Sequence, residues 1–145
     1  MESHEIQEIK KKKKSLKRYK NNLACIRRLE GKLYLLEERI KSVKSPNLSG
    51  MPRGGVPVTI EDLISDKMDL ERRIKKLKSK NKIVKSEILD EIDSLDDSRY
   101  CEILEAFFID CKTIQDIAEE MGYTDRYIYD LYSDAVTELA LNYSV

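Results

Sequence analysis

The sequence predicts an all-α protein: a pair of long helices, forming a hairpin or a coiled coil, followed by a compact three-helix unit with a helix-turn-helix. Three observations predict this class. Charged residues make up 37% of the 145 residues, an excess typical of long solvated helices. Five Gly and three Pro are too few for the many turns of a β-sandwich. Apolar residues recur at spacings of three and four, which is the period of one helix face.

The first long helix is expected from about residue 3 to residue 44. Its apolar residues alternate between spacings of three and four, and near Leu29 a spacing of three occurs twice in succession. Gly31, just after this point, weakens the helix by roughly 1 kcal/mol relative to Ala. Upstream, only Ile6 and Ile9 precede the run Lys10–Lys14, so we expect that end to fray when alone. The apolar seam comprises Leu16, Tyr19, Leu23, Ile26, Leu29, Leu33, Leu36, Ile40 and Val43.

A linker separates this helix from a second long helix. Residues 45–58 hold all three Pro and three of the five Gly, a composition typical of loops. Thr59 is the expected N-cap, Asp62 completes a capping box, and Val58 with Leu63 can form a hydrophobic staple. The seam that follows is Leu63, Leu70, Ile74, Leu77, Val84, Ile88 and Leu95, interrupted by Lys67, Asn81 and Glu91. Such polar interruptions commonly set register or partner choice, but the seam leaves open whether the helices pair within or between chains.

The net charge of zero conceals two opposite halves. Residues 1–86 carry 24 Lys and Arg against 11 Asp and Glu, a balance of +13, whereas residues 87–145 carry 3 against 16, a balance of −13. Such asymmetry indicates a polyanionic partner for one half, or docking of the two halves on each other, within or between chains. We therefore expect a basic helical domain over residues 1–95 and an acidic domain over residues 96–145.

Cap signals divide the acidic domain into three helices. The helix over 114–121 is the clearest, because a capping pattern precedes it and a glycine follows it. The first helix carries the apolar residues Cys101, Ile103, Leu104, Phe107 and Phe108, and the third carries Ile128, Leu131, Ala135, Val136 and Leu139. The cap and stop positions are Ser98, Thr113 with Asp116, Gly122, and Thr124.

The last two of these helices have the spacing of a helix-turn-helix. Ala118 lies where a small residue lets the second helix cross closely, and Gly122 lies four residues later, where the turn needs a positive φ. Ile128 and Leu131 then face the core of the unit. An ordinary packed helical hairpin is the alternative.

In a DNA-binding unit the second helix lies in the major groove. The residues expected to contact the groove are Thr124, Arg126, Tyr127 and Tyr129. Because the acidic domain alone should be repelled by DNA, the basic half is expected to supply the phosphate contacts. These backbone-contact residues are Lys11, Lys14, Arg18, Arg27, Arg28, Arg72, Arg73 and Lys76. Alternatively, the basic stretches are solvated faces, or they dock on the acidic domain and compete with DNA.

Two segments of the acidic domain carry a family resemblance. Residues Ile103–Phe108 and Thr113–Thr124 resemble region four of sigma factors and, more closely, the ArpU/RinA-like regulators of phages from Gram-positive bacteria. The linker, with Ser45-Pro46-Asn47 and Met51-Pro52-Arg53, and the helix that begins Ile60-Glu61-Asp62 are similar to small phage proteins that share this tail. The resemblance covers about residues 16–140. It implies a regulator of late phage genes, for packaging and lysis, that binds DNA near a promoter. Tails of the family usually carry cations where this chain has Phe107, Asp130 and Asp134.

Several other classes of protein are not expected. The only His is His4, and the chain lacks a Gly-rich phosphate loop and a Cys-x-x-Cys pair, so we expect no enzyme, no catalytic or metal site and no cofactor. Cys25, Cys101 and Cys111 are expected to be buried, reduced thiols. No apolar run reaches the roughly 18–20 residues of a membrane helix, and no signal peptide is evident. The expected location is the cytoplasm of a bacterial host, at the nucleoid.

The expected partners are DNA and a second copy of the chain in a homodimer. RNA polymerase is a further candidate partner. Two other functions remain open. The acidic domain can bind a basic partner, such as a face of RNA polymerase or a nucleic-acid-binding surface, or mimic nucleic acid. The chain can also be a coiled-coil protein of phage assembly. Salt dependence separates DNA binding from assembly, because DNA affinity falls steeply as salt rises.

Overall fold

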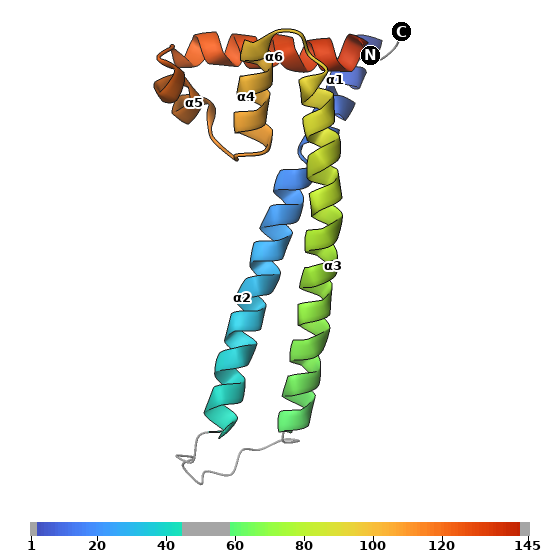
Figure 1. Cartoon of the computed structure of the whole chain (residues 1–145), viewed down its shortest axis with the longest axis vertical. Coiled ribbons are helices and arrows are strands. Elements are labelled where there is room, and N and C mark those ends of the chain that lie inside the picture. Colours follow the sequence, from blue (N-terminus) through green and yellow to red (C-terminus); the bar gives the residue numbers. More distant parts are fainter. Residues whose placement is uncertain (1–2, 45–58, 143–145) are drawn as a thin grey trace. The chain divides into compact units, whose positions relative to one another are not determined.

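The computed structural model describes residues 3–44 and 59–142, and within these ranges it consists of α-helices and their connections, without a strand (Figure 1). The predicted all-α class is therefore confirmed. The linker over residues 45–58, and with it the predicted staple of Val58, lies outside the described residues. The helices are α1 (His4–Leu16), α2 (Arg18–Lys44), α3 (Ile60–Asp93), α4 (Ser98–Phe108), α5 (Ile114–Met121) and α6 (Asp125–Asn142).

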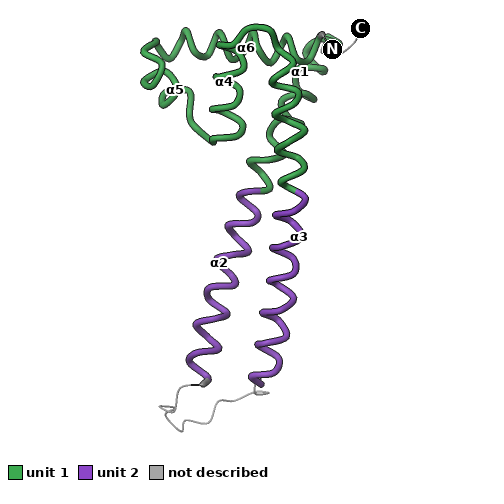
Figure 2. Tube along the Cα trace, in the orientation of Figure 1, with its two compact units in different colours: residues 1–22, 81–145 green, residues 23–80 purple. Residues whose placement is uncertain are grey.

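The chain forms two compact units, and the division falls within α2 and α3 (Figure 2). The core unit comprises Met1–Asn22 and Asn81–Val145, and the helix-pair unit comprises Leu23–Lys80. The charge of the sequence changes from basic to acidic near residue 95, where the sequence predicts a domain boundary. The compact units are divided differently, because α1 belongs to the same unit as the acidic C-terminal helices. The core unit holds 13 Lys and Arg against 19 Asp and Glu, a net charge of −6, and the helix-pair unit holds 14 against 8, a net charge of +6.

In the helix-pair unit, α2 and the first part of α3 run antiparallel (Figure 1). Ile26, Leu29 and Ile74 are buried between them, as the seam predicts, and Leu33, Leu70 and Leu77 pack partly buried around this core. Thr59 caps α3 as expected, since its Oγ1 accepts a hydrogen bond of 3.2 Å from the backbone N–H of Asp62. Helix α2 continues through Gly31.

The first long helix is interrupted at Lys17, which the sequence pattern does not predict. Arg18 Nε donates a hydrogen bond of 2.8 Å to the carbonyl of Ser15. In a continuous helix this carbonyl accepts the N–H of Tyr19, four residues on. A side chain that enters the hydrogen-bond ladder in this way is a recognised cause of helix kinks. The interruption lies beside Leu16, which is fully buried.

The core unit is built around α6, which packs against α1, α4 and α5. Helix α1 is an integral part of this core, because Leu16 is 0% exposed and Ile9 packs against the same cluster. Buried apolar residues come from five helices and the segments that join them: Leu16, Val84, Ile88, Ile92, Leu95, Ile103, Leu104, Phe108, Ile109, Ile117, Ala118, Ile128, Leu131, Tyr132, Ala135, Val136 and Leu139.

The helix caps of the core unit follow the sequence signals with one correction. Asp97, not Ser98, is the N-cap of α4, because its carboxylate accepts from the N–H of Arg99 and Ser98 is already helical. Thr113 and Asp116 form the complete capping box of α5. Gly122 follows α5 with a φ of 75°, as expected. Thr124 Oγ1 accepts a hydrogen bond of 3.2 Å from the N–H of Tyr127 at the start of α6.

Within residues 3–44 and 59–142, Asn81 is the one polar residue that is buried. Its side-chain amide donates a hydrogen bond of 3.3 Å to the carbonyl of Tyr19, and its oxygen accepts one of 3.0 Å from the amide of Asn22. A buried seam residue that is satisfied by the facing helix fixes the register of the two helices. The other two interruptions of the seam form ion pairs, Lys67 with Glu71 and Glu91 with Lys12.

Candidate nucleic-acid interface

The first half of α6 has one buried and one open face. Ile128 and Leu131 are buried in the core, 0% and 7% exposed. The side chains between and before them point outward, because successive helical residues are about 100° apart. The exposed residues at this end of α6 are Thr124, Asp125, Arg126, Tyr127, Tyr129, Asp130 and Asp134. All four residues predicted to contact a groove are therefore exposed on one end of one helix.

Two of these four residues make a polar contact with another side chain. Arg126 Nε lies 3.4 Å from the carboxylate of Asp130, one turn later, and both side chains are largely exposed. An exposed pair of this kind contributes at most about 1 kcal/mol, so it is readily exchanged for another anion. Tyr127 accepts a hydrogen bond of 2.9 Å on its hydroxyl oxygen from Arg99. This second contact ties α6 to the start of α4.

Arg99 is a residue that the sequence analysis missed. Its guanidinium donates to both carboxylate oxygens of Asp97, at 3.3 and 3.0 Å, as well as to Tyr127. The hydrogen bonds from Arg99 lower the pKa of Asp97 below its ordinary value, and Asp97 raises the pKa of Arg99. The N-cap aspartate two residues before Arg99 is the sequence signal for this pair, but its link to Tyr127 depends on the fold.

Tyrosines add an aromatic surface to the same end of α6. Tyr123, Tyr127 and Tyr129 are 45%, 37% and 51% exposed. The rings of Tyr123 and Tyr127 lie 4.7 Å apart between centroids, and Tyr129 lies 6.1 Å from Tyr132. Tyrosine has an apolar ring and a polar hydroxyl, and is therefore common where a protein meets a partner.

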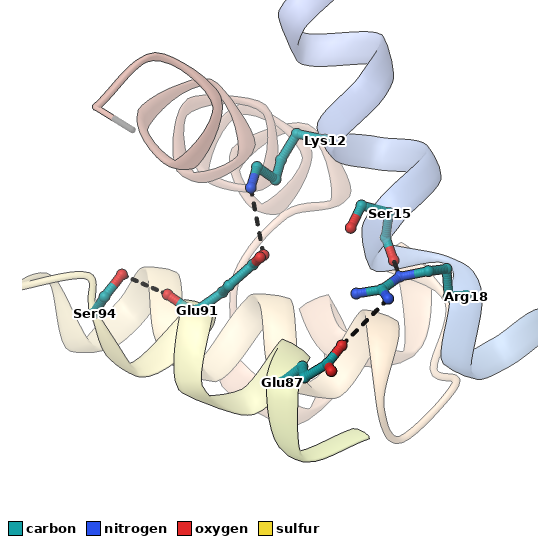
Figure 3. Close-up of polar contacts among 6 residues, drawn as sticks. All are labelled: Lys12, Ser15, Arg18, Glu87, Glu91 and Ser94. Carbon is teal, nitrogen blue, oxygen red and sulfur yellow. Dashed lines mark hydrogen bonds and ion pairs between the residues drawn. The ribbon is translucent and has the colours of Figure 1, made fainter. Parts of the chain in front are cut away.

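The basic N-terminal segment contributes cations to the core unit. Lys12 Nζ lies 3.4 Å from Glu91, and Arg18 lies 3.3 Å from Glu87 (Figure 3). Residues 87–97 contain six carboxylates, Glu87 and Glu91 among them. Two of the six therefore pair with cations from α1 and from the start of α2. The Lys12 and Glu91 side chains are only 16% and 22% exposed, and water therefore screens this pair less than the surface pairs.

Two further cations lie over aromatic rings of the C-terminal helices. Lys20 Nζ is 4.2 Å from the ring centroid of Phe107 on α4, and Lys13 Nζ is 5.8 Å from that of Tyr132 on α6. Both distances are within the range of cation–π attraction. The docking of basic on acidic segments that the charge pattern suggests therefore occurs within one chain for residues 1–22.

The residues predicted to contact the DNA backbone fall into both units. Lys11 and Lys14 are exposed on α1, and Arg18 is half-buried at the start of α2; these three belong to the core unit with α6. The remaining five are exposed in the helix-pair unit: Arg27, Arg28, Arg72, Arg73 and Lys76. Of these, Arg72 forms an ion pair of 3.1 Å with Asp69. The first three therefore belong to the same compact unit as α6, and the other five lie in the separate unit.

The cysteines differ from the sequence expectation. Cys25 and Cys111 are exposed, and Cys101 is half-buried, so the expectation of three buried thiols is wrong for two of them. The reason is that both exposed residues lie off the apolar seams, Cys25 beside Ile26 and Cys111 in the α4–α5 connection. The Cys101 thiol donates to the carbonyl of Ile92 at 3.3 Å, and burial raises its pKa.

Comparisons with protein-family models, with curated proteins and with solved structures found no match. Within residues 3–44 and 59–142, no helix has the length and apolar character needed to cross a membrane. The same ranges contain no group of three or more His, Cys, Asp or Glu side chains placed to hold a metal ion.

Proposed function

We propose that this chain is a DNA-binding regulatory protein in which α5 and α6 form a helix-turn-helix and the first two turns of α6 enter the major groove. The observation that carries the proposal is the junction of these helices. Gly122, in the left-handed conformation, ends α5, and α6 then starts from its Thr124 cap with Ile128 and Leu131 in the core. Its outer face at that end is exposed, as groove reading by a recognition helix requires.

Within this proposal, each exposed residue of α6 has a distinct role. Arg126 exchanges its pair with Asp130 for the acceptor atoms of a guanine, a bidentate contact that specifies sequence. Thr124 and Tyr129 donate their hydroxyl protons to phosphate oxygens. Tyr127, held by Arg99, presents its ring edge to a thymine methyl group.

The cations of residues 1–22 support the proposal, because they reduce the negative charge of the core unit to −6. Residues 97–142 alone carry 3 Lys and Arg against 11 Asp and Glu, a net charge of −8. Residues 1–22 contribute 8 Lys and Arg against 3 Asp and Glu, a net charge of +5, to the same unit. Lys11 can exchange its exposed pair with Glu8, at 3.6 Å, for a phosphate. Lys14 contacts phosphates as well, and such contacts supply most non-specific affinity. The resemblance to ArpU/RinA-like regulators favours late phage promoters as the sites of action.

A second candidate function is binding of a basic protein partner, such as a face of RNA polymerase. It is favoured by the sign of the charge on α4, α5 and α6 and by the exposed tyrosines among those acids. Tyrosine rings attract Lys and Arg through cation–π contacts, and carboxylates pair with the same cations. In this alternative the first turns of α6 contact protein rather than DNA.

Retention of sheared host and phage DNA by the purified full chain, followed by sequencing, tests the proposal. The salt concentration is about 0.15 M, where the Debye length is about 8 Å and loose surface attraction is screened. Enrichment of one discrete fragment supports a sequence-reading regulator. Uniform retention of all fragments indicates that the basic helices bind DNA without sequence preference. A lack of retention rejects DNA binding and favours the basic protein partner.

A further inference from the structure

The helix-pair unit has an open groove that the proposed function does not use. Its volume is about 650 Å³, and Leu33, Met68 and Ile74 supply its apolar lining. The polar residues of the groove are Glu30 from α2 and Glu71, Arg72, Lys75, Lys78 and Ser79 from α3. An apolar base with a charged rim is the arrangement of a protein interface rather than of a solvated helix surface.

Exposed apolar side chains extend this groove along both helices. Met68, in the groove, is 52% exposed. Tyr34 lies one turn after Glu30 on α2 and is 63% exposed, and Ile64 lies one turn before Met68 on α3 and is 38% exposed. Because residues four apart share a helix face, all three belong to the face that carries the groove. We call this surface, with the groove residues, the groove face.

The helix pair lacks a core of sufficient depth on its own. Its buried apolar residues are Ile26, Leu29, Ile40, Leu63 and Ile74, because two helices can bury only one seam between them. Helices gain most of their stability in proteins from packing of an amphipathic face, and a contiguous apolar patch on a surface usually marks an interaction site. The groove face therefore requires a partner, and its charges indicate which one.

The rim of the groove carries both signs of charge in similar numbers. Glu30 and Glu71 are acidic, and Arg72, Lys75 and Lys78 are basic. In a two-fold symmetric contact the same patch meets itself, so each acid needs a cation beside it, in its own chain or in the other copy. Glu30 has Lys78 at 3.2 Å and Glu71 has Lys67 at 3.9 Å within one chain, and exposed pairs of this kind are readily exchanged. A patch of mixed sign satisfies this condition, whereas a nucleic acid selects a patch of positive sign alone.

From these observations we infer that a second copy of this chain docks on the groove face, so that two helix pairs form a symmetric four-helix contact. The helix segments of the unit are roughly 30 Å long, and two adjacent helices present a face about 20 Å wide. The contact therefore buries on the order of 600 Å² per copy, close to the roughly 800 Å² of a standard interface. The sequence predicts a homodimer but does not indicate which surface forms its interface. The pairing inferred here does not depend on DNA binding.

Sedimentation equilibrium of the full chain at about 0.15 M salt tests the pairing. The expected mass is twice the 16.9 kDa of one chain. The double variant Tyr34→Lys/Met68→Lys places two charges in the contact, and its dimer dissociation constant rises at least about 100-fold, as for central interface residues. The control is Leu35→Lys, next to Tyr34 on the same helix. Leu35 is 68% exposed and lies about 100° or more around α2 from the groove-face residues Glu30, Leu33 and Tyr34, so this variant stays dimeric.

Three results would overturn the inference. The first would be a mass of 16.9 kDa for the unaltered chain across the micromolar range. The second would be a control that dissociates as readily as the test variant, and the third a test variant that remains dimeric. Far-ultraviolet circular dichroism establishes that each variant keeps its helices. If the test variant loses helicity, hydrogen exchange of the unaltered chain is measured at concentrations above and below the dimer dissociation constant. The inference requires that association protects amides within residues 64–79. Protection restricted to other segments rejects the groove face as the contact.

Discussion

Lys20 lies over the ring of Phe107, with its Nζ 4.2 Å from the ring centroid. The contact joins the start of α2 to α4. A partly desolvated cation–π contact contributes about 0.5–2 kcal/mol. The basic N-terminal segment is thus part of the structure of the acidic helices and not a separate arm.

Removal of the buried side chain of α1 tests this role in stability. Leu16→Ala is expected to lower the free energy of unfolding by about 2–5 kcal/mol, because Leu16 is fully buried in the core that includes α4 and α6. Ile6→Ala, on the same helix but at a residue that is 47% exposed, should change it by less than about 0.5 kcal/mol. Urea denaturation followed by circular dichroism measures both. Equal effects would mean that α1 does not belong to the core.

The two glycines of the described residues are expected to respond oppositely to the same substitution. Gly122→Ala destabilises by about 1–2 kcal/mol, because a Cβ is strained at its φ of 75° although nothing lies within 4 Å of it. Gly31→Ala stabilises by about 1 kcal/mol, since Gly31 lies inside α2, with nothing within 4 Å of an added Cβ. Thermal unfolding of the two variants gives the signs. Stabilisation by Gly122→Ala would contradict the left-handed turn.

The Asp97 carboxylate provides a pH-dependent readout of the α4 cap. Its pKa is lowered by the hydrogen bonds from Arg99, so its contribution to stability is complete above its ordinary value of 3.8 and is lost as the pH falls through the lowered pKa. Arg99→Gln should move the pKa of Asp97 upward toward the ordinary value in an NMR titration. Arg126→Gln, which leaves this contact intact, should not move it. An unchanged pKa in Arg99→Gln would show that the pair does not form.

Much of the fold follows from local signals in the sequence. Apolar spacing predicts the helices, and Thr59, Thr113, Gly122 and Thr124 mark helix ends because each cap acts within three or four residues. The interruption at Lys17 could not be predicted in this way, since it depends on how the Arg18 side chain meets the carbonyl of Ser15. The grouping of α1 with α6 was equally hidden, because long-range packing of Leu16 leaves no local pattern.

The candidate site was predicted in part. Exposure of Thr124, Arg126, Tyr127 and Tyr129 follows from helical periodicity around the buried Ile128. The bond from Arg99 to Tyr127 joins two helices, and no spacing within one helix indicates it. Contact of these residues with DNA stays a prediction.

Two substitutions of single cations are expected to affect DNA binding in different ways. Arg126→Ala should reduce discrimination between the target and a mismatched duplex by about 1–3 kcal/mol, because it removes a bidentate base contact. Lys11→Ala should weaken binding to both duplexes alike and reduce the salt slope by about 1, because it removes a phosphate contact. Fluorescence anisotropy titrations over a range of salt concentrations measure both. Undiminished discrimination in Arg126→Ala would refute its assigned role.

The ratio of two dissociation constants tests DNA reading most directly. One is measured for the duplex most enriched from genomic DNA, and the other for a duplex of equal length and composition with scrambled sequence, both with the full chain at about 0.15 M salt. A sequence-reading regulator binds the enriched duplex at least about 10³-fold more tightly. A ratio near one, or the absence of binding to either duplex, would contradict the assignment of α6 as a recognition helix.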